Sequence, residues 1–254
     1  MIHDQTYPTA RANRKTTWGY MMRRFSLTLL TVMFAGGSLG AQMPRRPSAY
    51  TNDPSYWITA GVSGFRANAV NDGVSASSWN FGNSTNIAYR GSIEKGGSNG
   101  SSFGVAGSWS HVPFLYTSTG FAPVPTGGVQ CANGSSCDAH LDLMTLVATF
   151  HSGGGIGFHQ VLELNGGVVA YSNLKRDSDG AALNPTGRNV DPLFALGYGF
   201  GYGLSDRTNL DVISDYSFAI HERKNLSNGT SNTNSMPGLR VSLRMGFGGG
   251  AHRR

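Results

Sequence analysis

The chain has 254 residues, of which 36 are glycine and only 13% are charged, a composition that argues against a soluble enzyme. The formal charge of +6 suggests a nucleic-acid surface, but residues 1–41 hold five Lys or Arg against one Asp, which leaves 15 basic (20 − 5) and 13 acidic (14 − 1) residues. An excess of about +2 is too small for a phosphate-binding surface, so we expect no nucleic-acid partner.

The first part of the chain is typical of a segment that directs export. Residues 22–41 begin with Met-Arg-Arg, continue with the apolar run FSLTLLTVMF and end in small residues, which predicts a cleaved signal peptide. The apolar run is too short to span a bilayer, which takes about 20 residues; the alternative is an amphipathic or core helix. Residues 1–21 are interpreted as an upstream extension, with a misassigned start as its origin, and residues 42–54 as a Pro-rich periplasmic linker.

Eight segments of alternating polarity follow, and each predicts a β-strand. Most of them reach the roughly 9–11 residues that a tilted strand needs to cross a membrane. Together they predict one domain over residues 55–248, with residues 249–254 as a tail. The predicted strands are 55–66, 78–94, 101–112, 139–151, 156–171, 193–204, 207–222 and 238–248.

The connections between these segments alternate strictly between long and short. The long ones are rich in Asn, Ser, Gly, Thr and Pro, as solvated loops are. A membrane barrel has short turns on the periplasmic side and long loops outside, whereas a soluble sandwich has no reason to sort its connections in this way. The sequence therefore predicts an all-β fold, an eight-stranded antiparallel up-and-down transmembrane β-barrel.

The two faces of the strands differ in polarity. In the last strand Arg240 and Arg244 alternate with large apolar residues, and the preceding strand carries Asp211 and Asp215 on its polar face. An Arg near the bilayer midplane costs about 2–4 kcal/mol, so the charged face is expected to point into the barrel. We interpret these charges as a structural network. Its predicted members are Arg90, Asp142, Glu163, Asp211, Asp215, Arg240 and Arg244.

Residues 194–204 alternate large apolar side chains with Ala195 and four glycines. An eight-stranded barrel is just wide enough to be filled by side chains, so the glycines are expected to leave room for the side chains of other strands. Aromatic residues near strand ends are expected to form interfacial girdles. The candidates for these girdles are Tyr56, Trp79, Trp109, Tyr116, Tyr171 and Tyr216.

The two cysteines, Cys131 and Cys137, lie close together in the longest connection. In an exported chain this spacing favours a disulfide that closes a small loop. The alternative, a zinc site with His140, lacks ligands, and we predict no metal site.

The stretches ELNGGVVAYSNLK, FALGYGFGYGLSDRTNLDVISDYSF and GLRVSLRMGFG resemble the later strands of the small outer-membrane β-barrel superfamily, the OmpA/OmpX-like porin-family barrels. The local likeness covers residues 156–248. It implies an integral protein of a Gram-negative outer membrane, a monomer whose partners are lipid, lipopolysaccharide and the barrel assembly machinery. The chain departs from the family at its end, where GGGAHRR follows Phe247 in place of a terminal aromatic residue.

Some barrels of this superfamily modify lipid A, so the histidines of the chain are candidate catalytic groups. His151 and Ser152 are adjacent and would face opposite sides of a strand, and no histidine has a nucleophile and an orienting group in reach. We therefore expect no catalytic residues and no cofactor. The candidate histidines are His111, His140, His151, His159 and His221.

The predicted function is that of a scaffold without dedicated catalysis, which presents long extracellular loops to an unknown ligand. Residues 117–137 are the candidate contact surface, since functional residues favour loops held by rigid scaffolds. A narrow or gated passive pore for small solutes is the alternative, and a lipid A-modifying enzyme is a more distant one.

Overall fold

The computed structural model describes residues 50–51, 54–97, 100–118, 129, 131, 135–186, 189–224, 226–249 and 252–253. The expected upstream extension, the signal peptide and most of the linker lie outside the described residues. No helix in the described part of the chain is long and apolar enough to cross a membrane.

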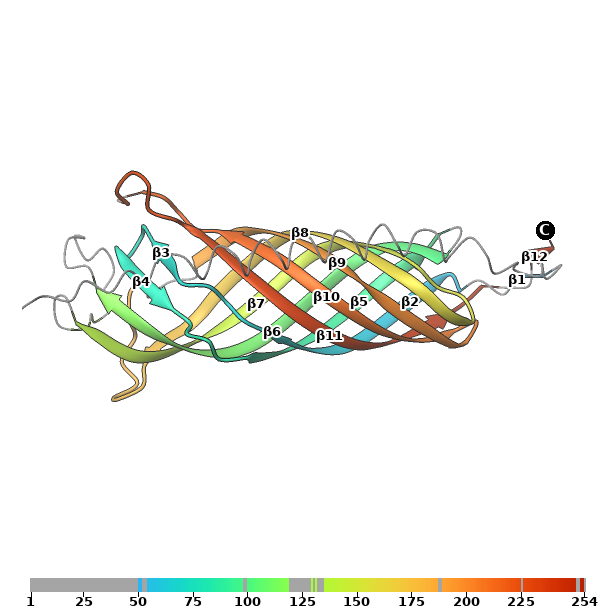
Figure 1. The fold of residues 1–254 in the computed structure, drawn as a ribbon, viewed down its shortest axis with the longest axis horizontal. Helices are drawn as coiled ribbons and strands as arrows, with labels where there is room; N and C mark the ends of the chain where they lie inside the picture. The colour runs from blue at the N-terminus through green and yellow to red at the C-terminus, as the bar shows by residue number, and fades with distance from the viewer. Residues whose placement is uncertain are drawn as a thin grey trace, which may run out of the picture. The chain divides into compact units, whose positions relative to one another are not determined.

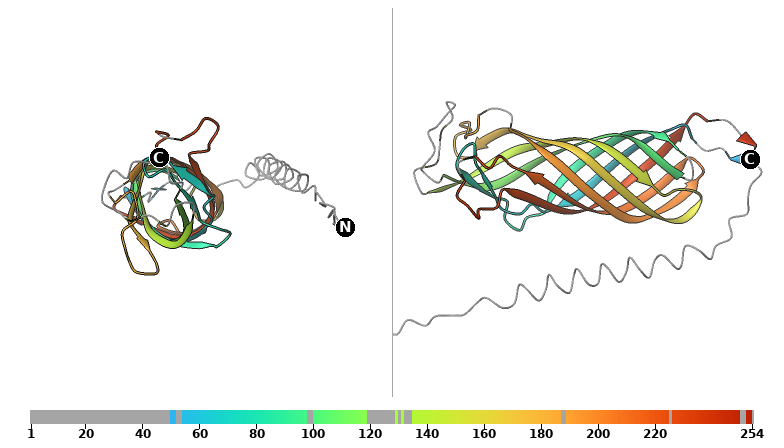
Figure 2. Two further views of the ribbon diagram at one scale, coloured as in Figure 1. Left: turned by 90° about the vertical axis from the view of Figure 1, so that its left-hand side faces the viewer. Right: turned by 90° about the horizontal axis from the view of Figure 1, so that it is seen from above.

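The described chain is an antiparallel β-barrel closed upon itself, as Figures 1 and 2 show. Around the wall the strands follow the order β6-β5-β2-β11-β10-β9-β8-β7, and β7 pairs with β6 to close the ring. Eight neighbouring strands joined in sequence order confirm the predicted up-and-down barrel. The wall strands are β2 (Tyr56–Phe65), β5 (Asn86–Gly96), β6 (Ser101–Ser118), β7 (Ser136–Ser152), β8 (Gly157–Arg176), β9 (Asn189–Ser205), β10 (Thr208–Ile220) and β11 (Thr233–Phe247).

Short and long connections lie at opposite ends of the barrel (Figure 1). The short turns comprise residues 97–100, 153–156 and 206–207, and the long connections comprise 66–85, 119–135, 177–188 and 221–232. We call these the turn end and the loop end. At the turn end, β1 (Tyr50–Thr51) pairs with β12 (His252–Arg253) outside the barrel wall.

The second predicted strand, 78–94, is wrong in its extent. Its first residues form β4 (Ser77–Asn80), which pairs with β3 (Val70–Asp72) as a hairpin inside the β2–β5 connection. The wall strand β5 begins only at Asn86. The cause is a turn at Gly82, whose φ is +63° and whose amide donates to the Asn80 side chain at 3.0 Å.

Several wall strands continue beyond their predicted ends toward the loops. The β6–β7 ladder runs as far as Thr117 and Ser136, and β4 adds to β6 through Trp79 and Tyr116. β8 extends to Arg176. We call the part of the wall on the loop side of the paired residues Ser110 and Leu143 the sheet extension, and it positions the side chains of the loop end.

The outer face of the wall is apolar and the inner face carries the charges. Phe200 and Phe218 are 39% and 40% exposed, whereas Arg240 and Arg244 are 3% and 1% exposed. Outward residues include Ile58, Ile93, Val105, Leu146, Leu164, Leu196, Val212, Leu239 and Leu243, all exposed. A continuous exposed apolar belt around a closed barrel is the surface of a membrane-embedded protein.

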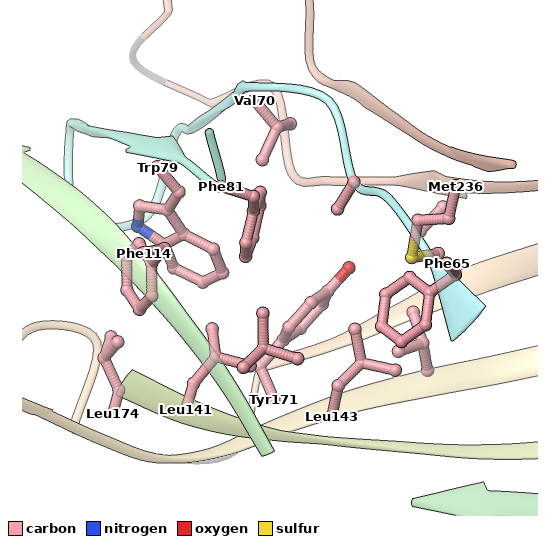
Figure 3. Close-up of a cluster of buried hydrophobic side chains, with 14 of the residues drawn as sticks. Phe65, Val70, Trp79, Phe81, Phe114, Leu141, Leu143, Tyr171, Leu174 and Met236 are labelled. Atoms are coloured by element: carbon pink, nitrogen blue, oxygen red, sulfur yellow. The ribbon is translucent and has the colours of Figure 1, made fainter. Parts of the chain in front are cut away.

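The expected aromatic girdles are correct only in part. Tyr56, Trp109 and Tyr216 face outward and are exposed. Trp79, Tyr116 and Tyr171 are instead buried inside the loop end of the barrel. The reason is that the interior of the sheet extension is an apolar core in which these three rings pack. Figure 3 shows Trp79 and Tyr171 within it.

Candidate functional site

A network of ion pairs fills the middle of the barrel, and Glu163 on β8 is its centre. Its carboxylate accepts from Arg240 on β11 at 2.6 Å, lies 3.6 Å from Arg90 on β5, and lies 3.2 Å from Nδ1 of His151 on β7. Arg240 also reaches Asp215 on β10 at 3.5 Å. Buried charges are tolerated only when paired, so strands from all sides of the barrel are linked through this point.

A second group of ion pairs lies nearer the turn end. Arg244 donates to Glu94 at 3.0 Å, and its guanidinium lies 4.2 Å from the ring centroid of Trp57. Ser92 donates to the same carboxylate at 2.6 Å, and Ser102 bonds both Glu94 and Arg244. Arg244 thereby balances the charge of Glu94, and the carboxylate accepts hydrogen bonds from three strands, β5, β6 and β11.

The glycines of β9 make room for this network. A Cβ at Gly197 would lie 2.7 Å from Asp215, and a Cβ at Gly201 would lie 2.4 Å from Asp211 and 2.3 Å from His159. The space is therefore occupied by side chains of the neighbouring strands β8 and β10. His159 and Asp211 come within 3.8 Å of each other there.

The structure places six of the seven predicted network residues on the inner face and one outside. Asp142 on β7 is the exception: its neighbours Leu141 and Leu143 are buried inside, and Asp142 points away from the lumen. The prediction for Asp142 is wrong because the inner face is apolar at this height, so the polar residues of β7 face outward. Asp142 instead contacts His111 at 2.9 Å.

The loop end of the interior is closed by an apolar plug built around the hairpin β3–β4. Trp79 is fully buried, and its ring centroid lies 5.8 Å from Phe114, 5.4 Å from Tyr171 and 5.2 Å from His221. Figure 3 shows Trp79 beside Phe81 and Phe114 at one side of the cluster, with Phe65, Leu143 and Met236 at the other. The plug comprises mainly Phe65, Val70, Trp79, Phe81, Phe114, Tyr116, Leu141, Leu143, Tyr171, Leu174, Leu183, Leu193 and Met236.

Polar contacts hold the hairpin in place. The Asp72 carboxylate accepts from the Ser75 amide at 2.8 Å and from the Asn189 side chain at 3.2 Å, while Ser77 accepts from the Trp79 indole at 2.8 Å. The Gly73 amide donates to the Glu222 carbonyl of the β10–β11 loop at 3.1 Å. The hairpin is thus fixed to two other parts of the barrel, β9 and the β10–β11 loop.

His221, which follows β10, is buried beside the plug and lies 3.1 Å from Asp191. Burial lowers the pKa of His221 to about 4, because the apolar surroundings disfavour the charged ring, and the carboxylate of Asp72 opposes this only in part. The ring is therefore neutral at neutral pH and packs on Tyr171 with a centroid distance of 4.9 Å.

A small cavity separates the plug from the ion pairs. Its volume is about 90 Å³, and its walls include Phe65, Leu193 and Met236 on one side and Arg90 and Asp215 on the other. A site for one water takes roughly 10–15 Å³ of such volume, so the cavity has room for a few waters.

The longest connection and the histidines were the other sequence candidates. Cys131 and Cys137 form a disulfide, and most of the loop between β6 and β7 lies outside the described residues. In the described residues no group of three or more His, Cys, Asp or Glu side chains is arranged to hold a metal ion. His151 and His159 take part in the interior contacts, and His111 and His140 lie on the outer face of the sheet extension.

Comparison with solved structures finds barrels of similar architecture at low sequence identity. Neisserial surface protein A is 12% identical with a TM-score of 0.48, and the match covers 76% of this chain and 97% of that one. The N-terminal β-barrel domain of Pseudomonas aeruginosa OprF is 15% identical with a TM-score of 0.38, covering 77% and 99%. Outer membrane protein OprG from the same organism is 12% identical with a TM-score of 0.37, covering 78% and 99%.

No protein-family model matches the chain, and no curated protein matches it. The eight-stranded closed architecture described above rests on the strand pairings of this chain itself.

Sequence reasoning did not anticipate the apolar plug. The sequence of β7 contains a signal, because apolar Leu143 and Met144 are adjacent. The large apolar residues stand at odd positions up to Leu143 and mainly at even positions from Met144 onward. Leu143 is buried and Met144 is 42% exposed. A comparable change separates Ser110 from Val112 on β6, where the inward side chains turn from polar to apolar.

Proposed function

We propose that this chain is a sealed outer-membrane barrel whose function is to present its sheet extension and long loops as an interaction surface outside the cell. The observation that carries the proposal is that the interior is filled at two levels. The ion pairs around Glu163 fill the middle, and the plug around Trp79 fills the loop end. A barrel of eight strands filled in this way has no room for a water-filled channel.

The proposal makes the loop end the functional end. Its sheet extension is rigid, because β6 and β7 remain paired as far as Thr117 and Ser136, and the hairpin β3–β4 packs into its concave side. At the start of the connection 177–188, Arg176, the last residue of β8, donates to Asp179 at 2.9 Å and lowers the pKa of Asp179 to about 2. Loops held by such a scaffold are suited to recognition.

The first test is conductance in planar bilayers. The wild-type chain is expected to give no discrete steps, and a variant in which residues 69–82 are replaced by a short Gly-Ser linker serves as the comparison. Steps from the wild-type chain would contradict the sealed barrel and favour the second candidate, a narrow gated pore. The cavity of about 90 Å³ between plug and ion pairs is the observation in favour of that candidate.

The second test concerns the interaction surface. Cells that display the wild-type chain are compared, for attachment to immobilised surfaces, with cells that display a chain whose residues 119–135 are replaced by a two-residue turn. Attachment is expected to fall while the barrel still shifts its gel mobility on boiling. Equal attachment would refute a role for this loop, and an altered lipid A mass in either strain would favour the enzyme alternative.

A further inference from the structure

A pair of histidines lies on the outer face of the sheet extension, away from the plug and from the interior ion pairs. His111 on β6 and His140 on β7 are diagonal neighbours, because His111 pairs with Asp142 and His140 pairs with Pro113. Their side chains are 54% and 28% exposed, and their ring centroids are 4.9 Å apart with planes tilted by 42°. Both rings are therefore open to solvent and in contact with each other.

Each ring is held by a carboxylate at the same nitrogen. Nδ1 of His111 lies 2.9 Å from Asp142, and Nδ1 of His140 lies 2.6 Å from Asp177. An ionised carboxylate only accepts hydrogen bonds, so Nδ1 must carry the proton in both rings. In the neutral rings the lone pair is then on Nε2, the arrangement in which a carboxylate orients a metal-ligating histidine.

The carboxylate of Asp142 is itself fixed. The side-chain amide of Asn173 on β8 donates to its second oxygen. Asn173 has a φ of +51° and lies within the register shift of the β7–β8 ladder, where His140 pairs with Lys175 and Asp142 with Ser172. Such irregularities in a strand redirect a side chain, here toward Asp142.

We propose that His111 and His140 form a two-ligand surface site for a divalent transition-metal ion of the Zn²⁺ or Cu²⁺ type. Two imidazoles bound through Nε2 at about 2.0–2.1 Å with a tetrahedral angle at the metal place their ring centres about 5 Å apart. The observed separation of 4.9 Å meets that requirement. Imidazole suits these ions, and the remaining coordination positions are left to water.

The site lies just beyond the membrane belt on the loop side. His111 follows the exposed Trp109 by two residues on the same face, and Trp109 stacks on Tyr89 with a centroid distance of 6.2 Å. Aromatic rings of this kind mark the membrane–water interface. A metal ion at His111 is thus reached from the aqueous side, and neither test of the proposed function depends on it.

The experiment is a Zn²⁺ titration of the full folded chain, prepared without a histidine tag and followed by calorimetry. One Zn²⁺ per chain is expected; His111→Asn and His140→Asn are each expected to weaken binding at least tenfold, and Asp142→Ala by about 10–100-fold. His252→Asn, which removes a histidine elsewhere in the sequence, is the matched control and is expected to bind as the wild type does. Heat-dependent gel mobility checks that every variant is folded.

Binding that persists unchanged in the folded His111→Asn/His140→Asn double variant would overturn the proposal, as would the absence of Zn²⁺ binding to the wild type. Electron paramagnetic resonance with Cu²⁺ gives an independent readout. Coupling to two imidazole nitrogens is expected for the wild type and to one for either single variant; one nitrogen in the wild type contradicts the pair.

Discussion

Replacing Arg240 with Met tests whether the interior of the barrel is sealed. Arg240 is almost fully buried and reaches both Glu163 at 2.6 Å and Asp215 at 3.5 Å. In the variant, Glu163 keeps Arg90 and His151, but Asp215 loses its ion-pair partner. Removing one partner of a buried pair costs about 3–5 kcal/mol, and because only one carboxylate is stranded we expect the free energy of unfolding to fall by about 3–4 kcal/mol.

The assay is urea unfolding in lipid vesicles, followed by tryptophan fluorescence. Arg240→Met/Asp215→Asn removes the stranded charge and is expected to recover about half of the loss, since the unpaired carboxylate, which is 22% exposed and lines the cavity, is its main cause. The control is Arg207→Met in an exposed turn, which should stay within about 0.5 kcal/mol of the wild type. A loss below about 1 kcal/mol for Arg240→Met would refute the reasoning, because exposed ion pairs have that magnitude and the lumen would then be water-filled.

Two further predictions concern the β9 glycines and the plug. Gly199→Ala is expected to lower the free energy of unfolding by about 1–3 kcal/mol in the same assay, because the added Cβ would lie 2.0 Å from the Val212 carbonyl oxygen. Gly91→Ala is the control and should be nearly neutral, because the atom nearest to its added Cβ is 3.8 Å away. Equal effects of the two substitutions would contradict the packing argument. For the buried pair of His221 and Asp191, burial lowers the pKa of His221 from 6.5 to about 4 and raises the pKa of Asp191 from 3.8 to about 7. As the pH falls, protonation of His221 favours the open form and protonation of Asp191 favours the closed form, so closure of the wild-type plug should depend little on pH between about 7 and 4. Hydrogen exchange at the Gly73 amide measures this opening; in His221→Gln only the Asp191 effect remains, so closure should strengthen as the pH falls, and closure that weakens in that variant would contradict the argument.

The wall of the barrel could be predicted from the sequence because each face of a membrane-spanning segment meets a single environment. The outer face meets lipid, and the inner face meets the barrel interior. Alternation such as Leu239-Arg240-Val241 has a single interpretation once the cost of an Arg in lipid is considered. The pairings inside could not be predicted in this way. Arg90 and Glu163 belong to β5 and β8, and their contact across the lumen depends on the tilt and stagger of the whole barrel.

The prediction for Asp142 was wrong for a different reason. The outer face of β7 meets lipid along one part of the strand and water along another. Next to lipid, β7 exposes Met144 and Leu146 and turns Thr149 inward. Beyond the membrane the outer face meets water and the interior must form its own core, so Leu141 and Leu143 turn inward and Asp142 outward. Apolar side chains of β7 therefore face outward within the bilayer and inward beyond it. Two adjacent apolar residues in the sequence mark the height of this change. By this argument the boundary on β7 lies at Leu143 and Met144, which puts His140 and Asp142 on the aqueous side, where a metal ion can reach them.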